Sequence, residues 1–376
     1  MRNKNKARRN EVRAMGRVSK GGKKRVRIRA VDFFCGVGGL THGLEKSGVE
    51  VVSGIDLDNA CKFPYETNND AKFINKDIAE ITGAEIKKLL GTSGLTLLAG
   101  CAPCQPFSTY SQSARKDKKH PDWSLVTSFG RLVRSVKPDL VTMENVPELK
   151  DHEVFVEFLE MLSGYFIDYK IIECDEIGIP QTRSRLVLIA SRKGKIELKL
   201  PKIRKKPTVR CAIESLPRIA AGKSHPKDPL HTSASLAKIN LKRIRASKPG
   251  GTWRDWPISL RAPCHRKKTG RTYSSVYGRM EWDAPSPTIT TQCFGFGNGR
   301  FGHPVQDRAI TLREAALIQS FPRRYAFLEK GDRINMKSLG RLIGNAVPVD
   351  LGKLIGKILV DHAVDLHRKP RRRSNS

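Results

Sequence analysis

The sequence lacks any long apolar stretch: within its 376 residues no run approaches the ~18 uninterrupted apolar residues of a transmembrane helix. It also lacks the features of a secretory signal, because its first residues are basic and polar. The eight cysteines are scattered along the chain, which favours reduced thiols over a disulfide framework. We therefore expect a protein that works in the cytoplasm and makes no contact with a membrane.

Acidic residues are scarce, with 37 Asp and Glu against 70 Lys and Arg, and the net charge is +33. The basic residues concentrate in three segments, with 13 in residues 1–30, 24 in residues 192–279 and 5 in residues 367–376. Such segregation is typical of a surface that binds a polyanion. Basic termini can serve solubility alone, whereas the internal block also contains Trp and Tyr, which favours nucleic-acid binding.

Between residues 30 and 190, short apolar runs alternate with amphipathic stretches, which is typical of a mainly parallel sheet covered by helices. The predicted strands are 30–34, 51–56, 72–74, 95–99, 140–144, 169–174 and 185–190, and the predicted helices are 39–46, 84–90, 124–136 and 154–163. The expected fold class is α/β, with a doubly wound, Rossmann-like sheet and a smaller irregular domain.

The periodicity stops after residue 191, which suggests a domain boundary. We expect a disordered basic arm at 1–29, the α/β domain at 30–191, an insert of loops and short strands from 192 to 278, the remainder of that region with a helix that returns to the α/β domain at 279–366, and a basic tail at 367–376. Thr311 and Glu314 have the spacing of a capping box and predict a helix that ends before Pro322. A last amphipathic helix is expected at 349–366.

Glycines follow the first predicted strand in Phe34-Cys35-Gly36-Val37-Gly38-Gly39-Leu40. Glycine lets the backbone turn tightly and approach a ligand at the start of a helix. A nicotinamide fingerprint would require glycine at position 41, where this chain has Thr41. Asp56 ends the second strand, where a carboxylate can accept ribose hydroxyls, and Asp77 follows the third. This pattern favours nucleoside binding over a dehydrogenase.

The loop after the fourth predicted strand contains Cys101-Ala102-Pro103-Cys104. We expect no metal here, because a structural zinc site needs a second pair of ligands and the sequence has no second Cys-x-x-Cys. A redox pair would open a helix, whereas Pro106 indicates a rigid loop. The favoured interpretation is a single activated thiolate, because open α/β sheets bind ligands at the carboxyl ends of their strands.

Three charged residues lie at the ends of two later predicted strands. Glu144 ends the fifth predicted strand, where burial would hold its carboxyl protonated for general acid catalysis; a carboxylate at a helix start is the alternative. Arg183 and Arg185 stand two residues apart, so they are expected on one side of a strand. There they would orient a carboxylate or a phosphate, unless they form an ordinary solvated strand end.

Together, in this order, these segments resemble the bacterial, S-adenosylmethionine-dependent cytosine-5 DNA methyltransferase family. The matching motifs are Phe34-x-Gly36-x-Gly38-Gly39, Pro103-Cys104-Gln105, Glu144-Asn145-Val146, Gln181-x-Arg183-x-Arg185, residues 279–291 and Gly344-Asn345-Ala346-Val347-Pro348. The resemblance covers residues 30–191 and 279–366. It implies that the basic block is the target-recognition region and that the last helix returns to the catalytic domain.

The resemblance implies methyl transfer from S-adenosylmethionine to carbon 5 of a cytosine flipped out of duplex DNA. Cys104 would add to carbon 6 and Glu144 would protonate or hydrogen-bond ring nitrogen 3, while Arg183 and Arg185 would hold the base and the phosphate. Cys101 is expected to be incidental. The implied cofactor contacts are Phe34, Gly36, Gly38, Gly39, Leu40, Asp56, Asp77, Pro103, Asn345 and Val347. The expected substrate contacts are Gln105, Ser108, Asn145, Arg271, Tyr273 and Tyr277.

Double-stranded DNA is the expected partner. We expect a monomer on DNA in the bacterial cytoplasm, associated with the nucleoid, and a cognate restriction endonuclease that acts separately. A transfer-RNA cytosine-5 methyltransferase of the same fold is the first alternative, which the long basic insert disfavours. A noncatalytic nucleic-acid-binding protein and a nicotinamide oxidoreductase are the others. The intact Cys104, Glu144 and arginine pair disfavour the noncatalytic alternative.

Overall fold

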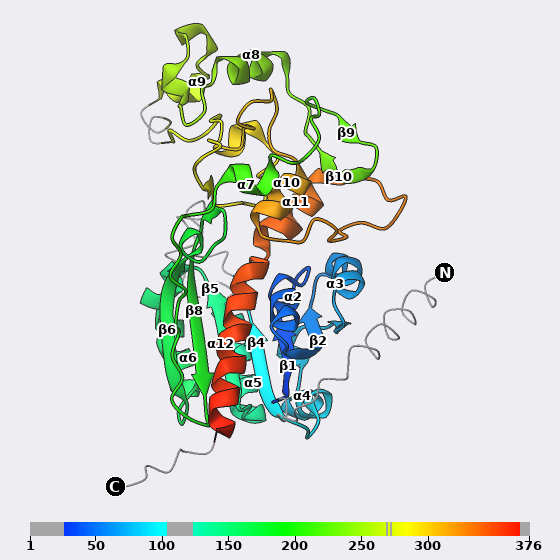
Figure 1. Ribbon diagram of the computed structural model, residues 1–376, viewed down its shortest axis with the longest axis vertical. Coiled ribbons are helices and arrows are strands. Elements are labelled where there is room, and N and C mark those ends of the chain that lie inside the picture. The colour runs from blue at the N-terminus through cyan, green and yellow to red at the C-terminus, as the bar shows by residue number, and fades with distance from the viewer. Residues whose placement is uncertain (1–25, 104–122, 268–269, 271–272, 369–376) are drawn as a thin grey trace.

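The structure, a computed structural model, describes residues 26–103, 123–267, 270 and 273–368. The chain forms two lobes along its long axis (Figure 1). The lower lobe contains the central sheet with its helices, and the upper lobe contains most of residues 209–345. The tail 369–376 and all but the end of the predicted basic arm lie outside the described residues.

Seven strands form the central sheet in the order β3-β2-β1-β4-β5-β8-β6. They are β1 Ile28–Phe33, β2 Glu50–Asp56, β3 Lys72–Asn75, β4 Leu95–Gly100, β5 Leu140–Asn145, β6 Phe166–Glu173 and β8 Ser184–Ser191. Strands β1 to β5 pair in parallel, while β8 runs antiparallel between β5 and β6. The prediction of a mainly parallel, doubly wound sheet is confirmed.

The strand order reverses at β1. The chain moves outward from β1 through β2 to β3 and then returns to place β4 on the other side of β1. Phe33 at the end of β1 pairs with Gly100 at the end of β4. Because open α/β sheets bind ligands where the strand order reverses, the loops after β1 and β4 mark the expected site.

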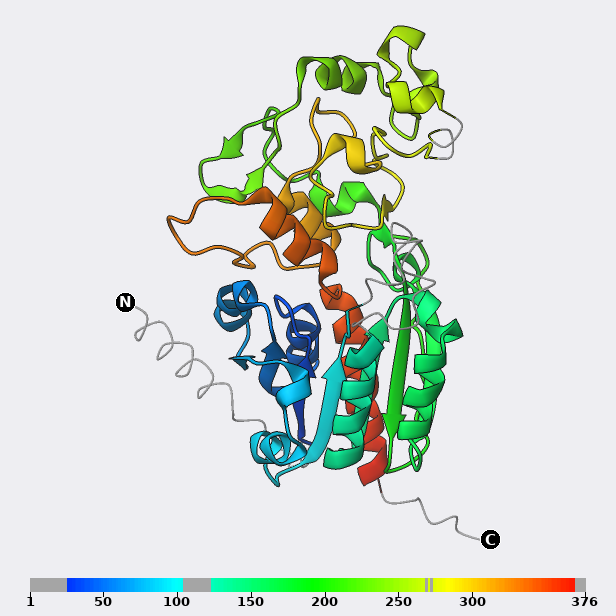
Figure 2. The ribbon, with the colours of Figure 1, turned by 180° about the vertical axis from the view of Figure 1, so that it is seen from behind.

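Helices cover both faces of the sheet. Helices α2 (Gly39–Lys46) and α12 (Val349–His367) cover one face, and α4 (Gly83–Leu90), α5 (Trp123–Val136) and α6 (Glu153–Met161) cover the other. Figure 2, which views the molecule from behind, shows the face that α4, α5 and α6 cover. Side chains alternate along a strand, so Ile28 and Ala30 enter one apolar core while Val31 and Phe33 enter the other.

Glycines bring α12 into close contact with α2. A Cβ on Gly43 would lie 2.4 Å from the carbonyl oxygen of Val349, and one on Gly352 would lie 2.9 Å from that of Leu40. No side chain fits in that space, so the two helices approach backbone to backbone. This packing places the carboxyl-terminal segment beside the loop that follows β1.

The upper lobe consists of short elements joined by irregular chain. They are α7 Val209–Ile213, β9 Ser224–His225, β10 Asp228–Thr232, α8 Lys238–Ala246, α9 Pro263–Arg266, α10 Leu312–Ile318 and α11 Met336–Asn345. The insert was expected to hold only loops and short strands, and α8 corrects that prediction. In α10 the capping box is present, because Thr311 Oγ1 accepts a hydrogen bond from Glu314 N at 3.1 Å and Glu314 accepts one from Thr311 N at 2.7 Å.

The lower lobe also contains α3 (Lys62–Asn68), and β7 (Gln181–Thr182) pairs in parallel with β11 (Ser286–Pro287) between the lobes. Within the described ranges, no helix is both long and apolar enough to cross a membrane.

Candidate active site

The loop after β1 adopts a conformation that glycine favours. Phe34, Gly36 and Gly38 have φ angles of 56°, 51° and 89°. The Gly36 amide donates a hydrogen bond of 2.9 Å to the Asp56 carboxylate at the end of β2, and the Asp58 amide donates another of 2.9 Å to the second oxygen. Burial raises the pKa of Asp56. The two backbone bonds therefore fix an acidic group beside the glycine loop.

The residues around Asp56 fit a nucleoside cofactor. Each Asp56 oxygen takes one backbone N–H, so each retains acceptor capacity for a ribose hydroxyl. Leu57, the next residue, is 68% exposed and offers an apolar surface beside that carboxylate. Sequence reasoning missed Leu57, although an apolar residue directly after a strand-end carboxylate was a usable signal.

The other expected cofactor residues have different environments. Asp77 accepts a hydrogen bond from Ala79 N at 2.9 Å and so starts a short helical turn. Leu40 is buried in the core, where its side chain anchors α2. Val347 is also buried, and its carbonyl oxygen would lie 2.1 Å from a Cβ on Gly39. Asn345 is exposed at the end of α11.

Glu144 lies at the carboxyl end of β5 and is 2% exposed. Its Oε1 is 2.8 Å from Nε of Arg185, which β8 places on the neighbouring strand. Its Oε2 accepts a hydrogen bond of 2.7 Å from Sγ of Cys101, on the loop after β4. The expectation of a neutral carboxyl rested on burial alone, and the structure adds a guanidinium in direct contact.

Asn145 holds the loop that follows β4. Its Nδ2 donates to the carbonyl oxygen of Ala102 at 3.1 Å, and its Oδ1 accepts from the amide of Val146 at 2.9 Å. The side chain is 2% exposed. We expected a substrate contact here, whereas these bonds give Asn145 a role in positioning the Cys101–Pro103 loop.

Arg183 and Arg185 bind different partners. Its guanidinium donates to the carbonyl oxygens of Ile289 at 3.0 Å and Gly344 at 3.3 Å, in the segments that lead to and from the upper lobe. Arg183 stands between β7 and β8, so the alternation assumed for one continuous strand is broken. A joint hold on base and phosphate stays a prediction: Arg185 contacts Glu144, while Arg183 also binds the segment that leads to α12.

The remaining expected residues lie outside the described ranges, at the surface, or in the core of the insert. Cys104, Gln105, Ser108 and Arg271 lie outside the described residues. Pro103 is exposed, and Tyr273 is 55% exposed. Tyr277 instead packs in an aromatic cluster, with ring centroids 5.8 Å from Trp256 and 5.4 Å from Phe296. That environment indicates that Tyr277 stabilises the insert.

The fold and the site together define a class of protein. A glycine loop and an acidic strand end lie on one side of the switch point, and a buried carboxylate lies on the other beside a loop that leads to a cysteine. This arrangement is that of a Rossmann-like transferase with a nucleoside cofactor. The profile of the C-5 cytosine-specific DNA methylase family matches residues 28–361, and the chain belongs to that family. It is a DNA (cytosine-5-)-methyltransferase whose methyl donor is S-adenosylmethionine.

Similar proteins span nearly the whole chain. Type II methylase M.HgiDII of Herpetosiphon aurantiacus is 49% identical over 348 residues, which are 91% of this chain and 97% of that protein. Type II methyltransferase M1.BsuMI of Bacillus subtilis is 31% identical over 353 residues, 87% of this chain and 79% of that protein. One solved structure is that of an E. coli prophage-encoded protein described as a DNA modification methyltransferase. It superposes with a TM-score of 0.68 at 22% sequence identity, covering 89% of this chain and 99% of that one, and so shares the fold.

Cys101 was expected to be incidental, and its contact with Glu144 gives it a testable role. We expect Cys101→Ala to lower the methyl-transfer rate about threefold to tenfold, because loss of one hydrogen bond, about 1 kcal/mol, leaves Glu144 less well oriented. Cys101→Ser keeps a donor at that position and should retain most of the activity. Steady-state rates for both variants on one duplex test this; equal rates for serine and alanine would show that the thiol contact does not matter.

Proposed function

We propose that this methyltransferase modifies one defined duplex sequence as the protective partner of a type II restriction endonuclease, which acts separately. It works as a monomer in the cytoplasm. The two similar curated proteins both carry type II names, which supports this biological role. The observation that carries the chemistry is the buried Glu144–Arg185 pair, in contact with the loop that leads to Cys104.

Carbon 5 of cytosine is a poor nucleophile, and the proposed residues change that. The Cys104 thiolate bonds to carbon 6 and pushes an electron pair into the ring. Glu144 donates a proton or a hydrogen bond at ring nitrogen 3, which balances the charge that arrives there. S-adenosylmethionine supplies the methyl group as a sulfonium. A base then removes the proton from carbon 5, the bond between Cys104 and carbon 6 breaks, and the proton on ring nitrogen 3 returns to Glu144, which restores the aromatic ring.

Arg185 keeps Glu144 in place for this role. A buried carboxylate without a partner costs several kcal/mol, and the contact with Arg185 offsets that cost. The guanidinium reaches Glu144 from the adjacent strand, so the sheet itself fixes the orientation of the carboxyl group. In our proposal Arg185 also presents positive charge to the flipped base and its phosphate.

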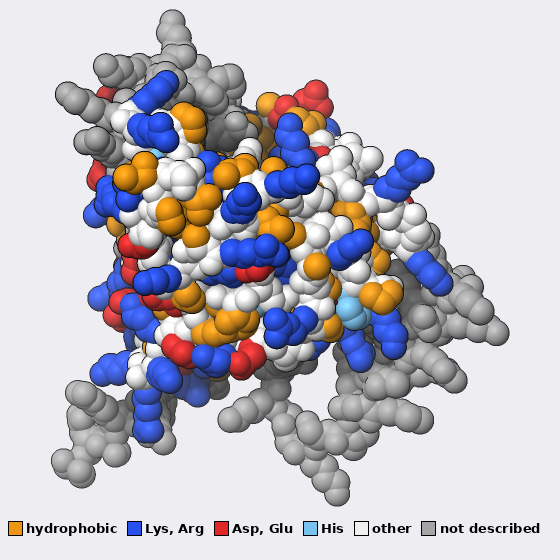
Figure 3. Space-filling model, turned by 90° about the horizontal axis from the view of Figure 1, so that it is seen from above, with side chains coloured by type: hydrophobic (Ala, Val, Ile, Leu, Met, Phe, Trp, Pro, Cys, Tyr) orange, Lys and Arg blue, Asp and Glu red, His pale blue; other side chains and the backbone are white. Residues whose placement is uncertain are grey.

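The upper lobe offers a surface for the DNA backbone. Figure 3, viewed from above, shows Lys and Arg side chains distributed among apolar ones, with fewer Asp and Glu. Lys242, Arg254, Arg266 and Lys267 are exposed members of the basic block. Release of condensed counterions makes basic side chains of this kind favourable for binding duplex DNA.

The cofactor role of Asp56 gives a quantitative prediction. We expect Asp56→Ala to raise the dissociation constant for S-adenosylmethionine by about 10- to 100-fold, because hydrogen bonds to a charged group contribute roughly 1.5–3 kcal/mol. Asp361→Ala, an exposed residue on α12, serves as the control and should bind normally. Isothermal titration calorimetry measures both. Unchanged binding by Asp56→Ala would place the ribose elsewhere.

The substrate can be identified by comparing duplex DNA with transfer RNA as methyl acceptors, using radiolabelled S-adenosylmethionine. We expect transfer to duplex DNA alone. Bisulfite sequencing of DNA from cells that express the chain should then reveal one methylated sequence context. Methylation of transfer RNA, or the absence of any methylated DNA context, would contradict the proposal.

A further inference from the structure

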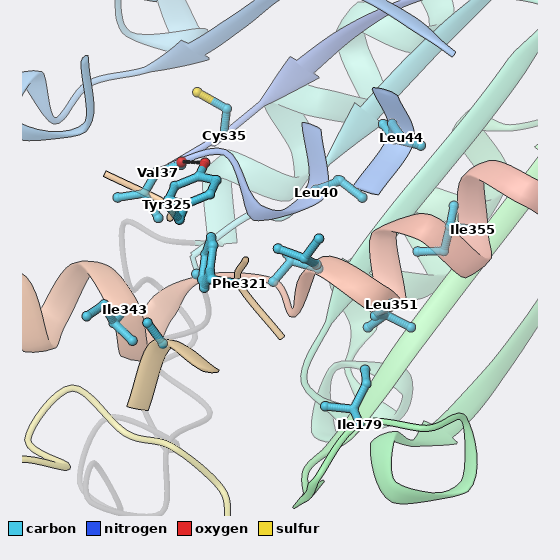
Figure 4. Close-up of a cluster of buried hydrophobic side chains, with 14 of the residues drawn as sticks. Cys35, Val37, Leu40, Leu44, Ile179, Phe321, Tyr325, Ile343, Leu351 and Ile355 are labelled. Carbon is cyan, nitrogen blue, oxygen red and sulfur yellow. Dashed lines mark hydrogen bonds between the residues drawn. The ribbon is translucent and has the colours of Figure 1, made fainter. Parts of the chain in front are cut away.

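The segment between α10 and α11 reaches down from the upper lobe and contacts the glycine loop. Three aromatic side chains of this segment pack together: Tyr325 lies 4.7 Å from Phe321 and 5.1 Å from Phe327, between ring centroids. Tyr325 is 2% exposed. Its hydroxyl donates a hydrogen bond of 2.5 Å to the carbonyl oxygen of Val37 (Figure 4). A residue nearly 300 positions away in sequence therefore holds the loop that follows β1.

The hydrogen bond from Tyr325 stabilises a loop whose backbone has several positive φ angles. Val37 stands between Gly36 and Gly38, which both have positive φ, and Phe34 adopts the left-handed region without being glycine. A non-glycine residue in that region costs about 1–2 kcal/mol. The loop is also tied to β2 through the amide of Cys35, which donates to Ile55 O at 3.2 Å. Among the hydrogen bonds of the described residues, only the one from the Tyr325 hydroxyl reaches the carbonyl oxygen of Val37.

The surroundings of Tyr325 keep its hydroxyl a donor. Burial raises the pKa of Tyr325 well above its usual value, so the phenol keeps its proton throughout the working pH range. Asn69 Nδ2 donates to the same hydroxyl at 3.3 Å. The ring of His42, on the helix after the loop, lies edge-on to Tyr325 at 5.3 Å. Asn69 and His42 thus restrict both the hydroxyl and the ring.

Hydrogen bonds also hold the backbone of Tyr325 and of the residue after it. Arg313 of α10 donates to the carbonyl oxygen of Tyr325 at 3.1 Å, and the same guanidinium forms a bidentate pair with Asp228 of β10 at 2.7 and 3.0 Å. The backbone of the next residue, Ala326, forms two hydrogen bonds with the side chain of Asn68. Its carbonyl oxygen accepts from Nδ2 at 2.8 Å, and its amide donates to Oδ1 at 2.9 Å. A continuous chain of bonds therefore runs from the insert, through Tyr325, to the glycine loop.

We propose that Tyr325 is a positioning residue for cofactor binding: the upper lobe uses its hydroxyl to hold Val37, and with it Gly36 and Gly38, in the conformation that receives S-adenosylmethionine. This inference rests on the proposed role of the glycine loop at the methionine end of the cofactor. It adds a residue outside the glycine, Pro-Cys-Gln and Glu-Asn-Val motifs, and it makes cofactor affinity depend on the docking of the upper lobe.

The test compares Tyr325→Phe with Tyr165→Phe. Tyr165 is a matched control, because its hydroxyl also donates to a backbone carbonyl, that of Pro138 at 2.7 Å, before the start of β5. Calorimetry gives the dissociation constant for S-adenosylmethionine, and steady-state assays on duplex DNA give KM and kcat. We expect Tyr325→Phe to raise the dissociation constant and KM by about three- to tenfold, the effect of one hydrogen bond, with kcat at saturating cofactor within about twofold of wild type. Tyr165→Phe should leave all three unchanged.

A second variant and a second measurement guard against simple misfolding. Asn69→Ala removes the hydrogen bond to the Tyr325 hydroxyl but retains the ring, and it should shift the dissociation constant in the same direction by a smaller factor. Hydrogen exchange of the loop amides should be faster in Tyr325→Phe than in Tyr165→Phe. Equal cofactor binding by the two tyrosine variants, or a loss in kcat without a change in binding, overturns the role of Tyr325. Failure of the wild-type chain to bind S-adenosylmethionine would instead overturn the proposed function.

Discussion

Cys104→Ala is expected to abolish methyl transfer, lowering kcat by at least about 10⁴-fold, the scale on which removal of a catalytic nucleophile acts. Without addition of sulfur to carbon 6, carbon 5 of cytosine is not electron-rich enough to attack a sulfonium. Binding of S-adenosylmethionine should remain, because Cys104 acts on the base. Transfer of a radiolabelled methyl group to duplex DNA measures the rate, and calorimetry measures the binding.

A trapped adduct tests the same residue independently. A duplex with 5-fluorocytosine at the target allows addition and methyl transfer, but carbon 5 then carries no proton for the base to remove, so sulfur cannot leave. The wild-type chain should remain attached to this duplex in a denaturing gel, and Cys104→Ala should not. Cys101→Ala is the matched control from the same Cys-x-x-Cys, and it should still form the adduct. An adduct in Cys104→Ala that disappears in Cys101→Ala would reverse the assignment.

Glu144→Gln is expected to lower kcat by about 10²- to 10⁴-fold, the usual contribution of a positioned acid or base. The amide has nearly the same shape, but in its place ring nitrogen 3 receives no proton and Arg185 has no carboxyl partner. Single-turnover methyl transfer measures the effect. Because Arg185 is only 12% exposed, loss of its partner should also reduce stability, by about 3–5 kcal/mol for a broken buried pair.

The double variant Glu144→Gln with Arg185→Gln separates catalysis from stability. It removes both charges, so the melting temperature should recover much of what Glu144→Gln loses. Methyl transfer should stay low, since the proton donor is still absent. Recovery of the rate together with the melting temperature would mean that Glu144 only supports the fold.

Local sequence predicted the regular part of the catalytic lobe well. The helix Gly39–Lys46 has the predicted bounds, and the seven predicted strands agree with the structure to within three residues at each end. These elements carry clear apolar periodicity, and the packing of both sheet faces reinforces it. Helix α3 was missed, because Pro64 and polar residues interrupt its pattern.

Helix α11 shows why other elements escaped prediction. Gly340 and Gly344 lower its helix propensity. A Cβ on Gly340 would lie 2.7 Å from the carbonyl oxygen of Thr291, and one on Gly344 would lie 2.4 Å from the carbonyl carbon of Thr290. The glycines therefore serve a close contact with a segment about 50 residues earlier. Tertiary packing outweighs the low helix propensity of the two glycines here.

The sequence by itself determined the chemistry of this protein: the α/β class, the glycine loop, the strand-end carboxylates and the motif order that identifies a cytosine-5 methyltransferase. These features are local, because spacing along a strand or turn fixes which groups a segment presents. Only the tertiary structure decided which groups meet. It assigned different partners to Arg183 and Arg185, joined Cys101 to Glu144, and placed Tyr325 on Val37. Such contacts depend on the packing of distant elements, since strand order and lobe docking bring together residues whose separation in sequence carries no signal.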